Sequence, residues 1–524
     1  MFKITSCIFV VCTAMNLFTA KPEFGSLSGN GSIHLQRCVG CLLGAVCGDI
    51  LGAIPEGQHM NQIQIRTLGK GSKLRDFMTG THLGIWQEGD RKGMYTDDSS
   101  SVLALARSLI RCNGLDPTDV SKSYAEWWLL APFRGYPETA ESVLMSVREG
   151  IDPSITGRIA FPNGSFANGA AMRIAPVGLA FRHTTDAQMR RAVAHAVFSS
   201  HIHPEAVDSA AVLARAISFA ATHSPTKDSQ SDNDGFLPLF APFEFLDALE
   251  AIAVTGNMRA RLRRLREHFG SVGWADVVWS MDDDDDGHVD RAAVGPRDWF
   301  QIRGVSAVGC ALWAFLSHWA ETPEEAIISA VDLGGDADTV GSMAGAVAGA
   351  LHGIDAFSDS VRAPPPHPQQ QRQQQQSDLA ANKGGAEACP CGWLPERWWR
   401  DMETGPYGRE FIVRTARELA ALDLREPAES APGAEAALLA LGNAASGGSD
   451  GDSAEAEAAA RQAHADARRA YARIAAQQSL KLYRLRHRAE AIIDVAFRQR
   501  ASAASAPDMD SVAQSYSSSH ESKT

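Results

Sequence analysis

Two short clusters of aspartates with hydroxyl neighbours are the residues of this chain best suited to chemistry. Each cluster stands at the expected start of a helix. The first, in YTDDSSS, comprises Thr96, Asp97 and Asp98, and the second, in LGGDADTVG, comprises Asp336, Asp338 and Thr339. A single aspartate or threonine at a helix start usually caps free backbone N–H groups and suits the helix dipole. Because one carboxylate is enough for a cap, two in each cluster favour a second role.

The second role that we infer is metal binding. Paired carboxylates beside hydroxyls form an all-oxygen site of the kind that Mg²⁺ or Mn²⁺ prefers. The segment after Thr339, SMAGAVAGALHG, consists mostly of small residues and is expected to be buried. Several carboxylates in such an interior would repel one another unless a cation lay between them. Two clusters of this kind suggest two metal ions.

Other acidic segments have different interpretations. GDILGAIPEG carries Asp49 and, where Pro55 stops the helix, Glu56. The run Asp282–Asp290 begins like a calcium loop, but Ala293 stands at the twelfth position, where a bidentate glutamate is required. We therefore interpret this run as a solvated acidic loop.

A glycine-rich segment, FPNGSFANGAAMRIAPVG, carries a different chemistry. Gly164 and Gly169 mark a tight loop, and a helix is expected to begin near Ala170. Backbone N–H groups in such a loop can hold a diphosphate, and Phe161 and Phe166 could stack on a base. A simple turn flanked by two core phenylalanines fits this segment equally well.

Paired histidines and cysteines do not complete a zinc site in the sequence. His201 and His203 start another expected helix, but no third ligand stands nearby in the sequence. The segments Cys38–Cys41 and Cys389–Cys391 carry two cysteines each, and we interpret all four as free thiols.

The elements that must position these residues are helices. Leu103, Ala106, Leu109 and Ile110 repeat at helical spacing, and similar repeats recur in later segments, whereas alternating strand patterns are scarce. We therefore predict an all-α domain.

Two glycine repeats predict the centre of this domain. Glycine recurs at every fourth position in two segments, at Gly40, Gly44, Gly48 and Gly52 and at Gly341, Gly345, Gly349 and Gly353. Each glycine inside a helix costs up to about 1 kcal/mol relative to alanine, so the close approach of another helix is the usual compensation. We predict that both helices run through the middle of the domain and favour their packing against each other.

Changes in composition divide the chain into five parts. These are an N-terminal segment at 1–35, the domain at 36–425 with a low-complexity insertion at 363–392, a linker at 426–454, a helical extension at 455–500 and a disordered tail at 501–524. Within the domain, the polar stretch Thr222–Asp234 is expected to be a loop. The aromatic stretch Trp393–Leu424 is expected to complete the core.

Charge and hydropathy exclude some partners. The formal net charge of -13 leaves no basic excess for nonspecific nucleic-acid binding, although a small anionic ligand can still be held locally. Residues 1–20 resemble a secretory signal with a poor cleavage site, so they leave the compartment open. No later segment is expected to span a membrane, because the small-residue run 340–353 is too short and follows charges.

Five segments of the chain resemble the motifs of the ADP-ribosylglycohydrolases, a family that includes the dinitrogenase-reductase-activating glycohydrolase of bacteria. They follow the family's order between residues 37 and 354. The segments are GCLLGAVCGDILGAIPEG, YTDDSSSVLALARSL, NGSFANGAAMRIAPVGL, SSHIHPEAV and VDLGGDADTVGSMAGAVAGALHG. The resemblance implies a compact all-α domain with a dinuclear metal cleft and two Mg²⁺ ions. It also implies hydrolysis of the bond that joins C1″ of ADP-ribose to an acceptor.

The resemblance assigns roles to individual residues. The implied metal ligands are Thr96, Asp97, Asp98, Asp336, Asp338, Thr339 and Glu56, of which Glu56 and Asp338 are the candidate catalytic residues. The implied substrate-binding residues are Asn163, Gly164, Ser165, Phe166, Ala167, Asn168, Gly169 and His201. Asp49 also matches a family position, but we interpret it as structural.

The acceptor is less well defined by the resemblance. The segment FRGYPETAESVLMSV is similar to the RGYG stretch of the subgroup that acts on ADP-ribosylserine, but Pro137 replaces the last glycine. Serine is therefore favoured over arginine, with a polymer end as a further possibility. Ser99 replaces the family's usual threonine and keeps a hydroxyl. The expected partner is an ADP-ribosylated protein or a related conjugate, bound by a monomer, and the family is mostly intracellular.

Two rival interpretations of these residues differ from the ADP-ribosylglycohydrolase one. The all-α prenyl diphosphate synthases also bind Mg²⁺ through aspartates, but they need DDxxD spacing, and Ser99, Ser100 and Ser101 follow the aspartate pair here. The other rival is a catalytically inactive relative that binds ADP-ribose or serves as a structural protein. The complete set of expected ligands argues against it.

Overall fold

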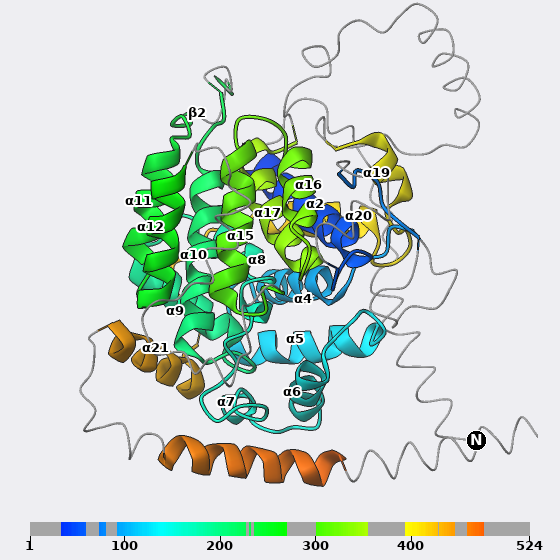
Figure 1. The fold of residues 1–524 in the computed structure, drawn as a ribbon. Coiled ribbons are helices and arrows are strands. Elements are labelled where there is room, and N and C mark those ends of the chain that lie inside the picture. The colour runs from blue at the N-terminus through cyan, green and yellow to red at the C-terminus, as the bar shows by residue number, and fades with distance from the viewer. Residues whose placement is uncertain are drawn as a thin grey trace, which may run out of the picture.

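Two glycine-rich helices pack against each other through the middle of the domain (Figure 1). They are α2 (Ile33–Ala53) and α17 (Ala337–His352). A β-carbon on Gly44 would lie 2.0 Å from the carbonyl oxygen of Gly345, and one on Gly345 would lie 2.1 Å from that of Gly44. Only glycine allows two backbones to approach so closely. The predicted contact between the two glycine repeats is confirmed.

The computed structural model describes residues 33–58, 73–79, 92–226, 230–231, 235–269, 300–354, 394–427, 429–445 and 458–475. The other helices are α4 (Asp97–Cys112), α5 (Pro117–Leu130), α6 (Glu138–Arg148), α7 (Pro153–Thr156), η1 (Asn168–Ala170), α8 (Ala175–Ala180), α9 (Asp186–Val197), α10 (Pro204–Ala221), α11 (Pro242–Ile252), α12 (Gly256–His268), α15 (Gly304–His318), α16 (Pro323–Asp332), α19 (Glu396–Asp401), α20 (Arg409–Leu419), α21 (Pro432–Ala445) and a helix at 458–475. The predicted all-α class is confirmed.

Among the described residues, a single small hairpin interrupts the helices. The strands β1 (Gln230–Ser231) and β2 (Gly235–Phe236) pair antiparallel, with Ser231 opposite Gly235. The hairpin overlaps the end of the predicted loop Thr222–Asp234. It is too short to change the fold class.

Further helices surround the central pair. On one side α15 and α16 pack on α17, and α10 packs on α17 as well. On the other side α20 packs on α2 and α4, and Trp398 of α19 is almost fully buried against Phe77. The stretch Trp393–Leu424 thus completes the core from residue 394 onward, as predicted.

The linker predicted at 426–454 is wrong in its middle. Residues Pro432–Ala445 form α21, which packs on α9 and α10 and buries Ala434, Ala437 and Leu441. Composition alone suggested a linker because alanine is abundant in both linkers and helices. These three residues recur at helical spacing. The segment is stable as a helix because this face packs against α9 and α10.

Several predictions concern residues outside the described ranges. They are the possible signal at 1–20, the acidic loop Asp282–Asp290, the insertion 363–392, the pair Cys389–Cys391 and the tail 501–524. Among the described helices, α2 is long and apolar enough to cross a membrane by length and composition, but 89% of the tested stretch is buried inside the domain. That burial is what a helix running through a core requires.

Candidate functional site

A cleft of about 500 Å³ opens where the N-termini of α4 and α17 meet. One end is acidic and is lined by Glu56, Asp97, Asp98, Asp336, Asp338 and Thr339. The wall toward the other end comprises α6 and the residues before it on one side, and the segment 157–169 on the other. Both predicted aspartate clusters therefore lie in one cavity, although more than 200 residues separate them in the sequence.

The second aspartate cluster is held by a tight turn. Gly334 and Gly335 have φ of 73° and 68°, a conformation that other residues seldom adopt, and they lead directly into Asp336. The backbone N–H of Asp336 donates to the Gln301 side-chain oxygen at 3.0 Å, and its Oδ2 accepts from Asn168 Nδ2 at 2.6 Å. These bonds fix the carboxylate before α17 begins.

Glu56 joins this cluster through the backbone. The N–H of Gly57 donates to the carbonyl of Gly335 at 2.8 Å, so the end of α2 is tied to the turn before Asp336. Ligand atoms of Glu56, Asp336 and Asp338 all lie within 4.8 Å of one another. This spacing brings three carboxylates within reach of one cation.

The carboxylates of the cleft repel one another. Burial raises the pKa of Asp98 well above its ordinary value, and the negative charges of Asp338 and Asp97 raise it further. Burial and then Asp338 do the same to the pKa of Asp336. Asp98 Oδ1 is buried and has no hydrogen-bond partner among the described residues. A divalent cation would relieve this repulsion and satisfy that oxygen, so the residues fit a metal.

Asp49 and Thr96 lie behind the cleft. Asp49 is fully buried and accepts from the N–H of Thr96 at 3.0 Å, the N–H of Ser99 at 2.9 Å and the Ser99 hydroxyl at 2.5 Å. These contacts agree with the interpretation of Asp49 as a structural residue. They also give the Ser99 hydroxyl a partner, Asp49. Thr96 caps α4 by accepting from Asp98 N–H at 3.4 Å and is not among the residues that line the cleft.

The glycine-rich loop supplies one wall. The residues Ser165, Phe166, Ala167, Asn168 and Gly169 line the cleft, together with Phe161. Asn163 and Gly164, which were predicted to bind substrate, are not among the residues that line the cleft. Gly164 has φ of 82°, and a β-carbon there would lie 2.4 Å from the Ile202 side chain.

The helix predicted to begin near Ala170 begins differently. A single 3₁₀ turn spans Asn168–Ala170, and α8 starts only at Ala175. Pro176 in the first turn of α8 offers no N–H group, which suits a helix start and not a helix interior.

The two histidines have separate roles. His203 caps α10, where its ring accepts from Glu205 N–H at 3.2 Å. His201 lines the cleft, and its Nδ1 lies 2.8 Å from the Ser200 hydroxyl. Burial and then Arg173 hold the pKa of His201 well below 6.5, so it is neutral at physiological pH.

Sequence reasoning missed two residues of the site. Arg173 is buried, lines the cleft and stacks over Tyr124 at 4.3 Å. A charged residue within the apolar run AAMRIAPVG was the signal that could have identified it. Gln301 has φ of 55° and holds Asp336, but nothing in the local sequence marks it.

The segment Phe133–Val147 supplies the opposite wall. The N–H of Asp97 donates to the carbonyl of Arg134 at 2.8 Å, and the Tyr136 hydroxyl donates to Ser100 at 2.8 Å. Arg134 is itself fixed by an ion pair with Glu403 at 3.0 Å and lies 3.6 Å from the ring centre of Tyr95. Gly135, Tyr136 and Pro137 line the cleft beside the first aspartate cluster.

Comparison with known proteins agrees with this geometry. The family model described as ADP-ribosylglycohydrolase matches residues 30–390. Several relatives are named ADP-ribosylhydrolase ARH3. The protein of Homo sapiens is 26% identical over 351 residues, covering 62% of this chain and 88% of that protein. The proteins of Bos taurus and Danio rerio are 27% and 28% identical and are covered to 92% and 84%, over 65% and 62% of this chain.

Proposed function

Because this chain belongs to the ADP-ribosylglycohydrolase family, we propose that it releases ADP-ribose from modified serine side chains of proteins with the help of two Mg²⁺ ions. That it is a glycosyl hydrolase acting on ADP-ribose conjugates follows from the family. The serine acceptor and the two Mg²⁺ ions are proposals that go beyond this family-level activity. The observation that carries them is the single cleft that joins a buried carboxylate cluster to the loop Ser165–Gly169.

The acidic end of the cleft is the proposed metal centre. The residues that would hold the ions are Glu56, Asp97, Asp98, Asp336, Asp338 and Thr339, with Thr96 supporting Asp98 from behind. When bound, Mg²⁺ (or Mn²⁺) would orient the ribose hydroxyls and lower the pKa of a water molecule. Asn168 holds Asp336 at 2.6 Å and so keeps one carboxylate fixed without metal.

The wall formed by the glycine-rich loop is proposed to bind ADP-ribose. In the loop Ser165–Gly169, the N–H groups of Ala167 and Asn168 already donate within the protein. The other backbone N–H groups of the loop, with Arg173 nearby, would attract the diphosphate. Phe161 is 46% exposed and, with Phe166, offers a ring face to the adenine. Neutral His201 would donate or accept a hydrogen bond without adding charge.

Chemistry at C1″ passes through a transition state that resembles an oxocarbenium ion. Glu56 or Asp338 would take a proton from the attacking water or assist the departing serine oxygen. Both carboxylates line the acidic end of the cleft, within 4.8 Å of each other and of Asp336.

The serine acceptor is supported by the wall beside Asp97. The stretch that resembles the ADP-ribosylserine subgroup, FRGYP, places Gly135, Tyr136 and Pro137 on the cleft. The Tyr136 hydroxyl is engaged with Ser100, so this wall is held close to the aspartates.

A pair of matched peptides tests the function. With Mg²⁺, we expect release of ADP-ribose from an ADP-ribosylserine peptide to be about 100-fold or more faster than from an ADP-ribosylarginine peptide of the same sequence. A chelator should stop both reactions. The measurement is free ADP-ribose by chromatography. Binding of ADP-ribose without release from either peptide would instead support the inactive relative.

The role of Glu56 is tested by Glu56→Gln. Removing a proton acceptor that acts in the transition state should lower kcat by about 10²- to 10⁴-fold. ADP-ribose should still bind, as measured by calorimetry at a Mg²⁺ concentration that keeps the metal centre loaded, because the loop wall is untouched. Full activity of the variant with metal bound would show that the assignment to Glu56 is wrong.

A further inference from the structure

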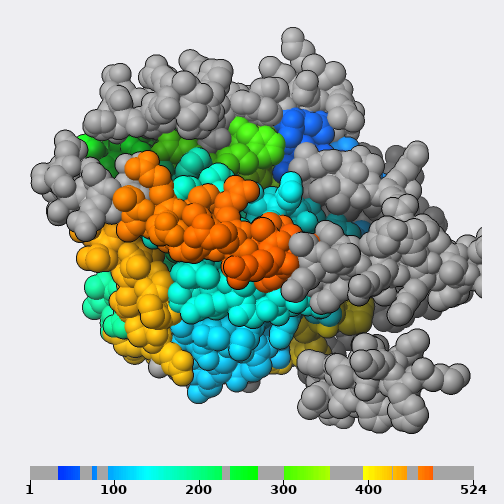
Figure 2. Space-filling view, turned by 90° about the horizontal axis from the view of Figure 1, so that it is seen from below, coloured from blue at the N-terminus to red at the C-terminus, as the bar shows by residue number. Residues whose placement is uncertain are grey.

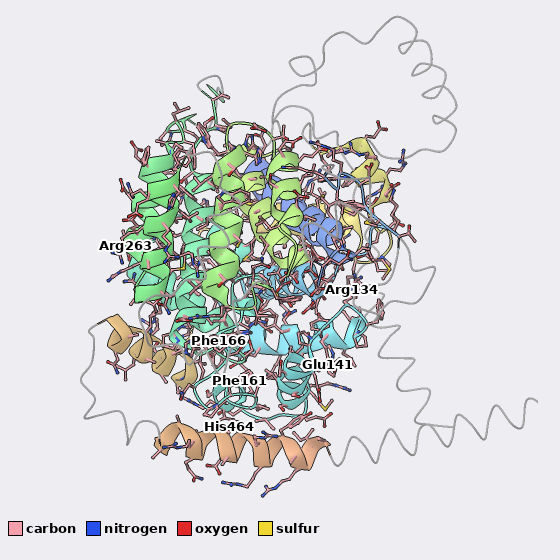
Figure 3. The ribbon with its side chains drawn as sticks, in the orientation of Figure 1. Arg134, Glu141, Phe161, Phe166, Arg263 and His464 are labelled. Atoms are coloured by element: carbon pink, nitrogen blue, oxygen red, sulfur yellow. The ribbon has the colours of Figure 1, made fainter. Side chains whose placement is uncertain are left out.

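The helix at 458–475 packs against elements of both cleft walls, although none of its described residues lines the cleft, and it lies outside the residues matched by the family model. We call this helix the strap. Figure 2 shows it crossing the lower face of the molecule, next to α21. In Figure 3, Phe166, Phe161 and His464 follow one another from the cleft toward the strap.

The strap touches both walls of the cleft. Ala467 is fully buried against Val143 of α6 and against Ile159, which lies in the segment before Phe161. The ring of His464 lies 2.7 Å from the carbonyl of Arg158. Val143 also lines the cleft, as do Ala160 and Phe161 next to Ile159. The strap therefore ties α6 to the start of the glycine-rich loop.

These contacts involve none of the carboxylates of the cleft. The loop runs from Phe161 to Asn168, and Asn168 contacts Asp336 at the acidic end. Arg158 and Ile159 precede Phe161, which is proposed to stack on the adenine and which Figure 3 places nearer the strap than Phe166. Beyond them, Ala460 of the strap closes a second cavity of about 600 Å³ with α21 and Asn163.

The strap packs on Val143 and Ile159 through the fully buried Ala467 and the partly buried Tyr471. The part of it that faces the domain consists mostly of small residues, and Ala467 is the only fully buried one among the described residues 458–475. The free energy of apolar burial scales with buried area, so alanines provide little of it. An element with few buried apolar contacts opens at low cost compared with global unfolding.

We propose that the strap is a cis-acting gate that slows the entry and release of ADP-ribose at the nucleoside end of the cleft. This inference rests on the proposed function, because it needs ADP-ribose as the ligand. The strap contacts the walls and not the carboxylates, so it should alter the rates of exchange and leave the equilibrium affinity largely unchanged.

A matched pair of variants on one helix tests the gate. Ala467→Glu places a charge in the buried contact with Val143 and Ile159, and should detach the strap. Ala472→Glu makes the same change on the exposed side of the same helix. A chain ending after Ala445 removes the strap entirely.

Stopped-flow binding of ADP-ribose in Mg²⁺ is the measurement. We expect kon and koff to rise together by about tenfold in Ala467→Glu and in the shortened chain, with Kd changed less than about twofold. Ala472→Glu should match the unmodified protein. Hydrogen exchange should be faster in α6 for Ala467→Glu, which reports strap release without any ligand.

The other outcomes are also decisive. Unchanged rates in Ala467→Glu with faster exchange in α6 would overturn the gate, because the strap would be released without effect. A changed Kd at constant kon would also overturn it and indicate a merely structural role. If no form bound ADP-ribose, the proposed function would fail, and the gate would fail with it.

Discussion

Asp338→Asn is expected to reduce hydrolysis of an ADP-ribosylserine peptide by about 10³-fold or more while the protein remains folded. Asp338 belongs to the three carboxylates within 4.8 Å of one another, and its charge raises the pKa of both Asp98 and Asp336. An amide of the same shape replaces a charged metal ligand with a weaker neutral one and removes a candidate proton acceptor. It also removes part of the repulsion among buried charges.

This second consequence gives a measurement independent of activity. Without metal, the variant should melt at the same temperature as the unmodified protein or higher, because one buried repulsive charge is gone. The unmodified protein should gain thermal stability on addition of Mg²⁺, since a ligand that binds only the folded state stabilises it. The variant should lose most of that gain.

A surface aspartate provides the control for Asp338→Asn. Asp247 is 68% exposed and pairs with Arg266, far in sequence from both clusters. Asp247→Asn should retain activity and the stabilisation by Mg²⁺. If Asp338→Asn kept both properties as well, Asp338 would be no part of a metal centre.

Gly44→Ala is expected to destabilise the fold by about 3 kcal/mol or more, at the upper end of overpacking costs. The added β-carbon would lie 2.0 Å from the Gly345 carbonyl oxygen and 2.7 Å from its carbon. Both are backbone atoms of α17, so the clash is relieved only by moving two central helices apart. Since α2 leads to Glu56 and the first turn of α17 carries Asp338, that movement would also separate the carboxylates and lower activity.

The matched substitution, Gly442→Ala, is expected to have the opposite effect on the stability of the fold. Gly442 lies on the exposed side of α21, and a β-carbon there would have no atom within 4 Å. Gly442→Ala should leave the melting temperature unchanged or raise it, because alanine is favoured over glycine in a helix by up to about 1 kcal/mol. Differential scanning fluorimetry compares the two variants. Equal melting temperatures would refute the account of helix packing.

Much of the site could be predicted because its signals are local. The period of four in the glycines is a property of one helix face, and it identified both central helices before any contact was known. The aspartate pairs exceeded what a cap requires, and the structure brings Asp97, Asp98, Asp336 and Asp338 to one cleft. The residue types and spacing within each segment therefore determined the fold class and the acidic end of the site.

The tertiary structure decided what depends on distant partners. Asn168 and Asp336 are 168 residues apart, and no local pattern predicts their hydrogen bond. Thr96 carries the expected residue type, yet its burial behind Asp98 depends on Asp49 of another helix. The packing of α21 and the position of the strap depend likewise on surfaces formed by other helices. Helical periodicity is encoded over a few neighbouring residues, whereas the choice of partner depends on which buried surfaces and unpaired polar groups the folded chain brings together.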